Sequence, residues 1–205
     1  LLIGLLKLAA QVSNTGGNYI RDETLGQMAR QAVAAGTAGG LTERQVVGSF
    51  MAGMDFWQNI LVVAIQFFLV SRVFKYLGVA GALFVLPVIA LGGYGAFALF
   101  PALGVIRVSQ ISVNATDYSL QNTLRRALFL PTSREAKYKA LQAVETFFWR
   151  AGDMLSAATT FVVVQMLGLG VRSYAVVILG FVALWIVIAI GLSKENRRLT
   201  ADASV

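Results

Sequence analysis

The sequence predicts an all-α membrane protein, and three of its features indicate a polytopic bundle of transmembrane helices. Of its 205 residues, 57% are hydrophobic and only 13% are charged, whereas soluble domains have roughly 45–50% apolar and about 25% charged residues. Apolar stretches of about 20 residues, the length that crosses a bilayer as a helix, recur along the chain. Basic residues cluster between alternate stretches, as in proteins that cross a membrane several times. We therefore expect the apolar side chains to face lipid and neighbouring helices.

The absence of cysteine and histidine excludes disulfides, Cys or His metal sites, cysteine nucleophiles and His-based triads. The pairs Gly16-Gly17 and Gly39-Gly40 lack the spacing and the lysine of a nucleotide-hydrolysing phosphate loop. We predict that the protein is not an enzyme and uses no metal or cofactor. The net charge of +7 is interpreted as loop charge that sets topology, so no nucleic-acid partner is expected.

Hydropathy divides the chain into six spans. The first is interpreted as the end of a helix whose start is missing, because it opens on Leu1 without a methionine or a basic leader. A long Gly-rich loop, with room for a short surface helix over about 25–35, is expected to follow it. The predicted boundaries are a partial helix at 1–12, the loop at 13–45, helices at about 46–74, 79–100, 103–130, 133–167 and 171–192, and a tail at 193–205.

Proline residues help to define these boundaries. Pro87 lies inside the span 79–100, so we expect a kink there. Pro131 ends the span 103–130. Thr132 to Glu135 has the spacing of a capping box, so the next helix should begin near Ser133.

Basic residues predict the orientation of the chain in the membrane. Positive charges that follow alternate spans place those connections in the cytoplasm. These charges are Arg72, Lys75, Arg134, Lys137, Lys139, Lys194, Arg197 and Arg198. The C-terminus is then cytoplasmic and the loop at 13–45 lies outside. Six spans with a cytoplasmic C-terminus match one half of a twelve-helix, major-facilitator-like transporter, whose N-terminal six-helix half would be missing from this chain.

The fourth span carries a polar stripe. Its members recur at intervals of one, three or four residues, which places them on one helical face. They are Arg107, Gln110, Asn114, Asp117, Tyr118, Gln121, Asn122 and Arg125. An ionised group in lipid is costly, so Asp117 is expected to face other helices or a watery cavity. The alternative is that the stripe only joins helices through hydrogen bonds.

The fifth span repeats the pattern, so a second polar stripe is expected to face inward. Its members are Gln142, Glu145, Thr146, Trp149, Arg150, Asp153, Ser156 and Thr160. Arg150 and Asp153 are three positions apart and could form an ion pair, either with each other or with Asp117 and Arg125. Such a pair would be a structural lock or part of a solute site. The second span offers Asp55, Asn59 and Gln66 on a similar face.

The cytoplasmic end of the two polar spans is strongly basic. Its charges are Arg125, Arg126, Arg134, Lys137 and Lys139. A cavity below such a mouth would concentrate an anionic solute, and Arg and Lys supply charge-assisted hydrogen bonds to phosphate oxygens. A phosphorylated solute is therefore the natural ligand. The alternative is that these residues only determine topology.

Two runs of sequence carry a resemblance to a known family. They extend from Asp117 to Ala140, with the element Lys137-Tyr138-Lys139, and from Glu145 to Asp153. Both resemble the ATP/ADP translocase family of plastids and obligate intracellular bacteria, and above all its homologues in free-living bacteria. The resemblance implies nucleotide exchange by alternating access, a cavity between two six-helix halves, and a place in the bacterial inner membrane. This chain would be the C-terminal half.

From the resemblance and the polar stripes together we expect a nucleotide or a related phosphorylated anion as substrate. The expected substrate-binding residues are Arg107, Asn114, Asp117, Gln121, Asn122, Arg125, Lys137, Lys139, Arg150 and Asp153. Where exchangers of that family have an acidic group early in this half, the chain has Asn14 and Asn18, which leaves another anion open. Two rival functions are a major-facilitator carrier for another solute and a membrane anchor or sensor module that transports nothing.

Overall fold

The structure, a computed structural model, describes residues 1–128 and 134–202, and every regular element in these ranges is helical. This confirms the predicted all-α fold class. The α-helices are α1 Leu2–Ala34, α2 Glu43–Ala64, α3 Val70–Ala82, α4 Val85–Leu99, α5 Leu103–Thr116, α6 Asn122–Leu128, α7 Arg134–Ala143, α8 Trp149–Thr160 and α9 Val171–Asp202. Four π-helical turns join some of them: η1 Ile65–Leu69, η2 Asp117–Gln121, η3 Val144–Phe148 and η4 Phe161–Met166.

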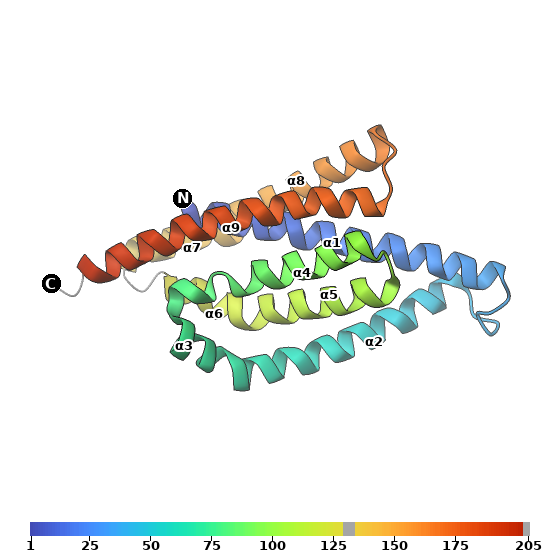
Figure 1. The fold of residues 1–205 in the computed structure, drawn as a ribbon, viewed down its shortest axis with the longest axis horizontal. Coiled ribbons are helices and arrows are strands. Elements are labelled where there is room, and N and C mark those ends of the chain that lie inside the picture. Colours follow the sequence, from blue (N-terminus) through green and yellow to red (C-terminus); the bar gives the residue numbers. More distant parts are fainter. Residues whose placement is uncertain (129–133, 203–205) are drawn as a thin grey trace.

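The helices form an elongated bundle (Figure 1). α4 and α5 run side by side, with α2 packed against α5 and with α1 and α9 along the other side of the pair. α1 also packs against α8 and α5, so it is the helix around which the others gather. The core between α1, α4 and α9 contains Tyr94, Tyr174 and Trp185, whose side chains are fully buried.

α1 is much longer than predicted. The partial helix at 1–12 and the loop at 13–45 were wrong as boundaries, since the helix continues to Ala34 and the connection covers only 35–42. Glycine favours loops in solution, but Gly16 and Gly17 are buried inside α1 where neighbouring helices approach closely. The Tyr94 hydroxyl donates a hydrogen bond of 3.1 Å to the backbone oxygen of Ser13. The glycines therefore serve helix packing here.

Glycine does make the turn after α1. Gly36, Gly39 and Gly40 have φ of 69°, 60° and 81°, a left-handed conformation that suits glycine. The chain then enters α2 through a capping box, in which the Thr42 hydroxyl accepts from the Gln45 backbone N–H and the Gln45 side chain accepts from the Thr42 backbone.

The next two predicted spans need smaller corrections. The helix predicted at 46–74 continues through η1 and α3, and the chain breaks its helical conformation at Gly78, with a φ of 66°. The helix predicted at 79–100 is interrupted at residues 83 and 84, so the chain does break near Pro87 as expected, and this proline lies in the first turn of α4. The backbone donors of a first turn have no partner within the helix, so proline costs little there.

The later spans are found close to their predicted places. The span 103–130 corresponds to α5, η2 and α6, and the span 133–167 corresponds to α7, η3, α8 and η4. Pro131 and the start of the capping box at Thr132 lie outside the described residues. The last helix is longer than predicted, because α9 continues to Asp202 through most of the tail assigned to 193–205. Lys, Glu and Arg are good helix formers, so the tail extends the helix.

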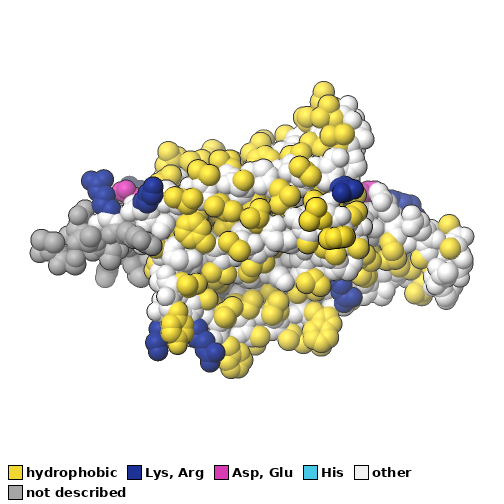
Figure 2. Space-filling model, viewed as in Figure 1, with side chains coloured by type: hydrophobic (Ala, Val, Ile, Leu, Met, Phe, Trp, Pro, Cys, Tyr) yellow, Lys and Arg dark blue, Asp and Glu magenta, His cyan; other side chains and the backbone are white. Residues whose placement is uncertain are grey.

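The surface of the bundle is apolar along its middle. Figure 2 shows hydrophobic side chains over most of the visible face, with Lys and Arg gathered toward its two ends. Large apolar side chains are exposed on the bundle surface, such as Phe67 at 74%, Phe68 at 69% and Met154 at 73%. In the described part of the chain, Glu43–Ala82 and Val171–Asn196 are long and apolar enough to cross a membrane, and α4 is apolar but shorter. These features are consistent with a helical membrane protein.

The packing of α1 predicts that Gly17→Ala destabilises the fold. A Cβ at this position would overlap the Tyr94 hydroxyl and the Gln110 amide, and overpacking of a core costs about 1–3 kcal/mol. Gly26→Ala, in the same helix, would meet only the flexible end of Arg30 at 3.4 Å and should be neutral or stabilising by about 0.5–1 kcal/mol. Thermal unfolding of the full-length protein in detergent compares them, and equal melting temperatures would contradict this packing.

Candidate functional site

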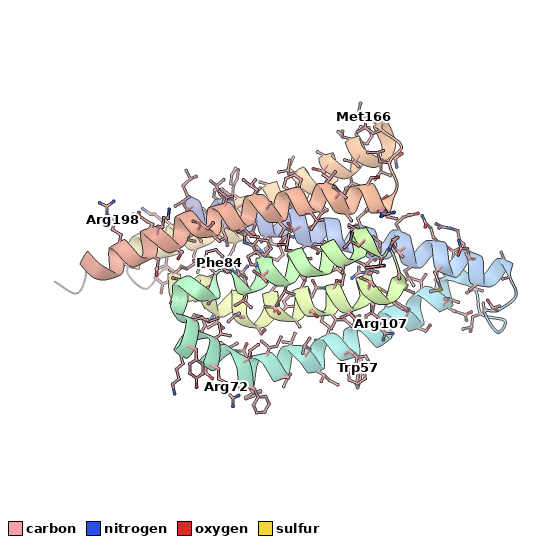
Figure 3. All side chains as sticks on the ribbon, viewed as in Figure 1. Trp57, Arg72, Phe84, Arg107, Met166 and Arg198 are labelled. Atoms are coloured by element: carbon pink, nitrogen blue, oxygen red, sulfur yellow. The ribbon has the colours of Figure 1, made fainter. Side chains whose placement is uncertain are left out.

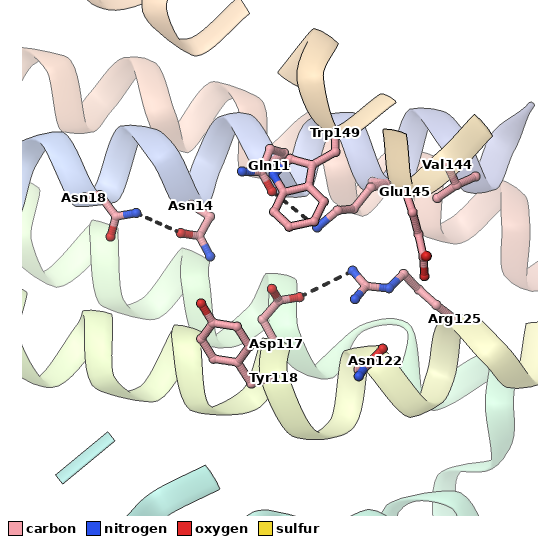
Figure 4. A pocket seen from close by; sticks show the side chains of 11 residues that line it. Gln11, Asn14, Asn18, Asp117, Tyr118, Asn122, Arg125, Val144, Glu145 and Trp149 are labelled. Atoms are coloured by element: carbon pink, nitrogen blue, oxygen red, sulfur yellow. Dashed lines mark hydrogen bonds and ion pairs between the residues drawn. The ribbon is translucent and has the colours of Figure 1, made fainter. Parts of the chain in front are cut away.

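A polar cavity of about 380 Å³ lies between α1, the η2–α6 segment and the η3–α8 segment. Figure 4 shows these side chains converging from three directions. Its lining is Lys7, Gln11, Asn14, Asn18, Asp117, Tyr118, Asn122, Arg125, Val144, Glu145 and Trp149. Every lining residue except Val144 carries a polar group, whereas two other hollows, beside α4 and α5 and beside α2, are bordered mainly by apolar side chains. This polar cavity is the candidate site.

α1 supplies one wall of the cavity. Lys7, Gln11, Asn14 and Asn18 follow one another at intervals of four, three and four residues, which is one face of an α-helix. Asn18 donates to Asn14 at 3.2 Å, and Asn14 donates to Asn114 on α5 at 3.2 Å. The assignment of a loop from residue 13 onward cut this stripe in two. Lys7 and Gln11 were therefore missed, although the helical spacing was present in the sequence.

The second wall depends on the π-helical turn η2. Asp117 and Arg125 are eight positions apart, which in a regular α-helix turns their side chains about 80° away from each other. A π turn takes up one extra residue, so the two positions come nearly two full turns apart and share a face. Arg125 Nη1 lies 3.8 Å from Asp117 Oδ1, and both side chains are largely buried. The turn thus creates the ion pair.

Several polar atoms of this ion pair have no hydrogen-bond partner in the described part of the chain. At 3.8 Å the contact is electrostatic and too long for a hydrogen bond. Arg125 Nε and Nη1 and Asp117 Oδ1 are buried and have no hydrogen-bond partner within the described part of the chain. Unsatisfied buried groups of this kind are uncommon in folded proteins and mark places where a ligand or water can bind.

α8 supplies the third wall and a link to α1. Asp153 Oδ1 accepts hydrogen bonds from Gln11 Nε2 at 2.8 Å and from Thr15 Oγ1 at 3.0 Å. Gly152 allows this contact, because a Cβ there would lie 2.7 Å from Gln11 Cβ. Arg150 and Asp153 do not form the ion pair that their spacing made possible. Asp153 turns toward donors on α1, and Arg150 is exposed and has no ion pair with any carboxylate of the described residues.

The other predicted binding residues lie outside the cavity lining. Asn114 is buried behind it and donates to Gln58 at 3.0 Å. Gln121 is fully buried, with no partner for its Oε1 in the described part. The guanidinium of Arg107 lies over the Phe50 ring at 5.0 Å, where α5 runs beside α2 (Figure 3). Asn114 and Arg107 thus join α5 to neighbouring helices, which is the alternative role that the polar stripe left open.

The basic mouth is only partly described. Lys139 is exposed on α7 and does not line the cavity, and the side chain of Lys137 lies outside the described residues. Of the predicted binding residues, the structure brings Asp117, Asn122 and Arg125 into the cavity. The structure also places three further members of the predicted polar stripes in the cavity lining, which the sequence analysis did not select as binding residues. They are Tyr118, Glu145 and Trp149.

The cavity can hold a charged, amphipathic solute. Lys7 and Arg125 supply positive charge, and Asp117 and Glu145 supply negative charge. Lys7 donates to Gln11 Oε1 at 3.3 Å and lies 5.1 Å from the centre of the Trp149 ring. The described residues contain no group of His, Cys, Asp or Glu that could hold a metal ion.

A polar cavity within a bundle of apolar helices is typical of membrane proteins that handle polar solutes. The chain is 25% identical over 168 residues to ADP,ATP carrier protein 1 of Chlamydia pneumoniae. The alignment covers 71% of this chain and 33% of the carrier, so the chain corresponds to about a third of that protein's length. No protein-family model and no solved structure matches the chain. The name of the relative describes a carrier, which is the class of protein expected from the sequence.

The contacts of Asp153 predict different effects for two neighbouring substitutions on α8. Asp153→Ala removes the shared acceptor of Gln11 and Thr15 and should cost about 1–3 kcal/mol of unfolding free energy. Arg150→Gln changes an exposed side chain and should stay within about 0.5 kcal/mol of the parent. Unfolding of the full-length protein in detergent measures both. A larger loss of unfolding free energy for Arg150→Gln would support a stabilising ion pair between Arg150 and Asp153.

Proposed function

We propose that this chain is part of a secondary membrane carrier that exchanges nucleotides or related phosphorylated anions by alternating access. The cavity supports this most directly, because it places Lys7, Arg125 and a set of side-chain amides inside an apolar helical bundle. Similarity to an ADP,ATP carrier supports the same class of solute.

The chemistry of the lining suits a phosphorylated solute. Arg125 Nε and Nη1, which have no hydrogen-bond partner in the described part of the chain, can donate charge-assisted hydrogen bonds to phosphate oxygens. Amide groups such as those of Asn18 and Asn122 can bond to a base or a sugar, and the rings of Tyr118 and Trp149 offer flat apolar surface. Asp117 can hold Arg125 while the cavity is empty.

The proposed membrane orientation follows from the basic residues. Phe67, Phe68 and Met154 would face lipid or the rest of the carrier. Lys137, Lys139 and the end of α9 would lie in the cytoplasm, and the connection at 35–42 would lie outside. Lys137 and Lys139 would then form a basic mouth that attracts anions. A bacterial inner membrane is the proposed location.

The rest of the carrier would complete the cavity. The chain corresponds to a third of the length of its relative, and we propose that it is the C-terminal six-helix half of a twelve-helix protein. The cavity would lie between the two halves, which rock about it in alternating access. The exposed rings of Tyr118 and Trp149 suit a surface that another part of the protein covers.

The transport proposal predicts saturable uptake of labelled ADP or ATP by the full-length protein in proteoliposomes, stimulated by nucleotide inside. Arg125→Gln removes cavity donors and should weaken binding about 10-fold to 100-fold, as expected for a loss of about 1.5–3 kcal/mol. Arg72→Gln, an identical change at an exposed arginine of α3, is the matched control. If nucleotides and phosphorylated metabolites give neither uptake nor thermal stabilisation, this solute class is excluded. Uptake that survives Arg125→Gln would remove Arg125 from the site.

The orientation predicts that single cysteines at positions 137 and 38 lie on opposite sides of the membrane. The chain has no cysteine of its own, so labelling of each introduced thiol is specific in a full-length protein whose other cysteines are removed. In intact cells, an impermeant thiol reagent should react at position 38 and reach position 137 only after permeabilisation. Labelling at 137 but not at 38 would reverse the orientation.

A further inference from the structure

Lys7 is the most deeply buried charged side chain among the described residues. Only 6% of it is exposed, and Leu6, Ala9 and Ala10 around it in the sequence are buried as well. Its ammonium nevertheless lines the polar cavity. Removing a charge from water is costly unless an opposite charge or several hydrogen bonds replace the lost water.

The protein compensates this charge poorly. The Lys7 ammonium has three donors, but its side-chain hydrogen bond goes to one neutral acceptor, Gln11 Oε1, at 3.3 Å. The Trp149 ring lies 5.1 Å away, and a ring face replaces only part of the lost hydration. In the described part of the chain no carboxylate oxygen lies within 4.0 Å of Lys7 Nζ. Arg125, the other cation of the cavity, has Asp117 at 3.8 Å.

The surroundings of Lys7 hold it in place. Asp153 accepts from Gln11 Nε2 at 2.8 Å, which fixes the orientation of the Gln11 amide. The amide oxygen is thereby turned toward Lys7 Nζ. Asp153 is thus a positioning residue that acts through Gln11, and Figure 4 shows Gln11 and Trp149 on the same side of the cavity.

We propose that Lys7 is the principal anion-binding residue of the cavity, and that it takes the phosphate oxygens of the solute. This rests on the proposed function. An entering phosphate would supply the missing negative charge at Lys7, whereas at Arg125 it must compete with Asp117. The anion therefore gains most on the α1 side of the cavity.

Lys7→Met in the full-length protein tests this with two readouts of opposite sign. Without ligand, removal of a poorly compensated charge should leave the melting temperature in detergent unchanged or higher. The affinity for ADP and for pyrophosphate should fall about 10-fold to 100-fold, since a charge-assisted contact is lost. Lys7→Arg keeps the charge and should retain more affinity than Lys7→Met. Lys75→Met, at an exposed lysine of α3, should leave both affinities unchanged.

Several results would overturn the role of Lys7. They are affinities of Lys7→Met within about threefold of the parent, a lower melting temperature or loss of folding in Lys7→Met, and a parent protein that binds neither ligand. Loss of binding in Lys7→Arg equal to that in Lys7→Met would also count against it. If the parent binds pyrophosphate through Lys7 but transports no phosphorylated solute, the transport proposal fails and the anion site stands. If Lys7→Met leaves transport of a phosphorylated solute unchanged, the role of Lys7 fails and the transport proposal stands.

Discussion

The structure depends on the two different faces that α1 presents to its neighbours. On one side, Gly16 and Gly17 leave no side chain between α1 and the helices α9 and α4, so Ile178 and Tyr94 approach the backbone directly. The opposite side carries Lys7, Gln11 and the asparagines that follow them. Close packing behind the helix holds the polar side in front of η2 and η3, since an element fixed on one side cannot rotate. Glycine here contributes shape, and the polar residues contribute chemistry.

π-helical turns determine which side chains meet α1. Each such turn adds a residue to the helix and rotates everything that follows relative to what precedes. At η2 this brings Arg125 onto the face of Asp117. η3 precedes Trp149, whose ring reaches Lys7, and it contains Glu145, which lines the same cavity. At η2, a helix of regular pitch would turn Asp117 and Arg125 about 80° away from each other, so the irregular pitch there is the condition for their ion pair.

The fold class and the two polar stripes follow from the sequence because hydrophobic content and helical spacing are local properties. The extent of α1 does not, because Gly16 and Gly17 favour a loop locally and lie in a helix where neighbouring helices pack closely against them. Lys7 was missed for the same reason. The phase shift at η2 cannot be found from regular spacing. The position of Arg107 over Phe50 depends on the packing of α5 against α2, which spacing within α5 does not reveal. The hydrogen-bond donors of Asp153, Gln11 and Thr15, lie on α1, over a hundred residues away in the chain. Spacing within α8 therefore could not identify them.

The balance of charges in the cavity has a consequence for any solute that must leave as well as enter. A site built from cations alone would bind a phosphorylated anion tightly and release it slowly. Here Arg125 is paired with Asp117, so binding at Arg125 must displace an existing contact, and release restores it. Lys7 has no carboxylate at comparable distance among the described residues, so attraction there is undiminished. Lys7 would attract the anion, whereas at Arg125 the carboxylate of Asp117 would compete with it. This arrangement favours binding of moderate strength, which repeated binding and release of a solute require.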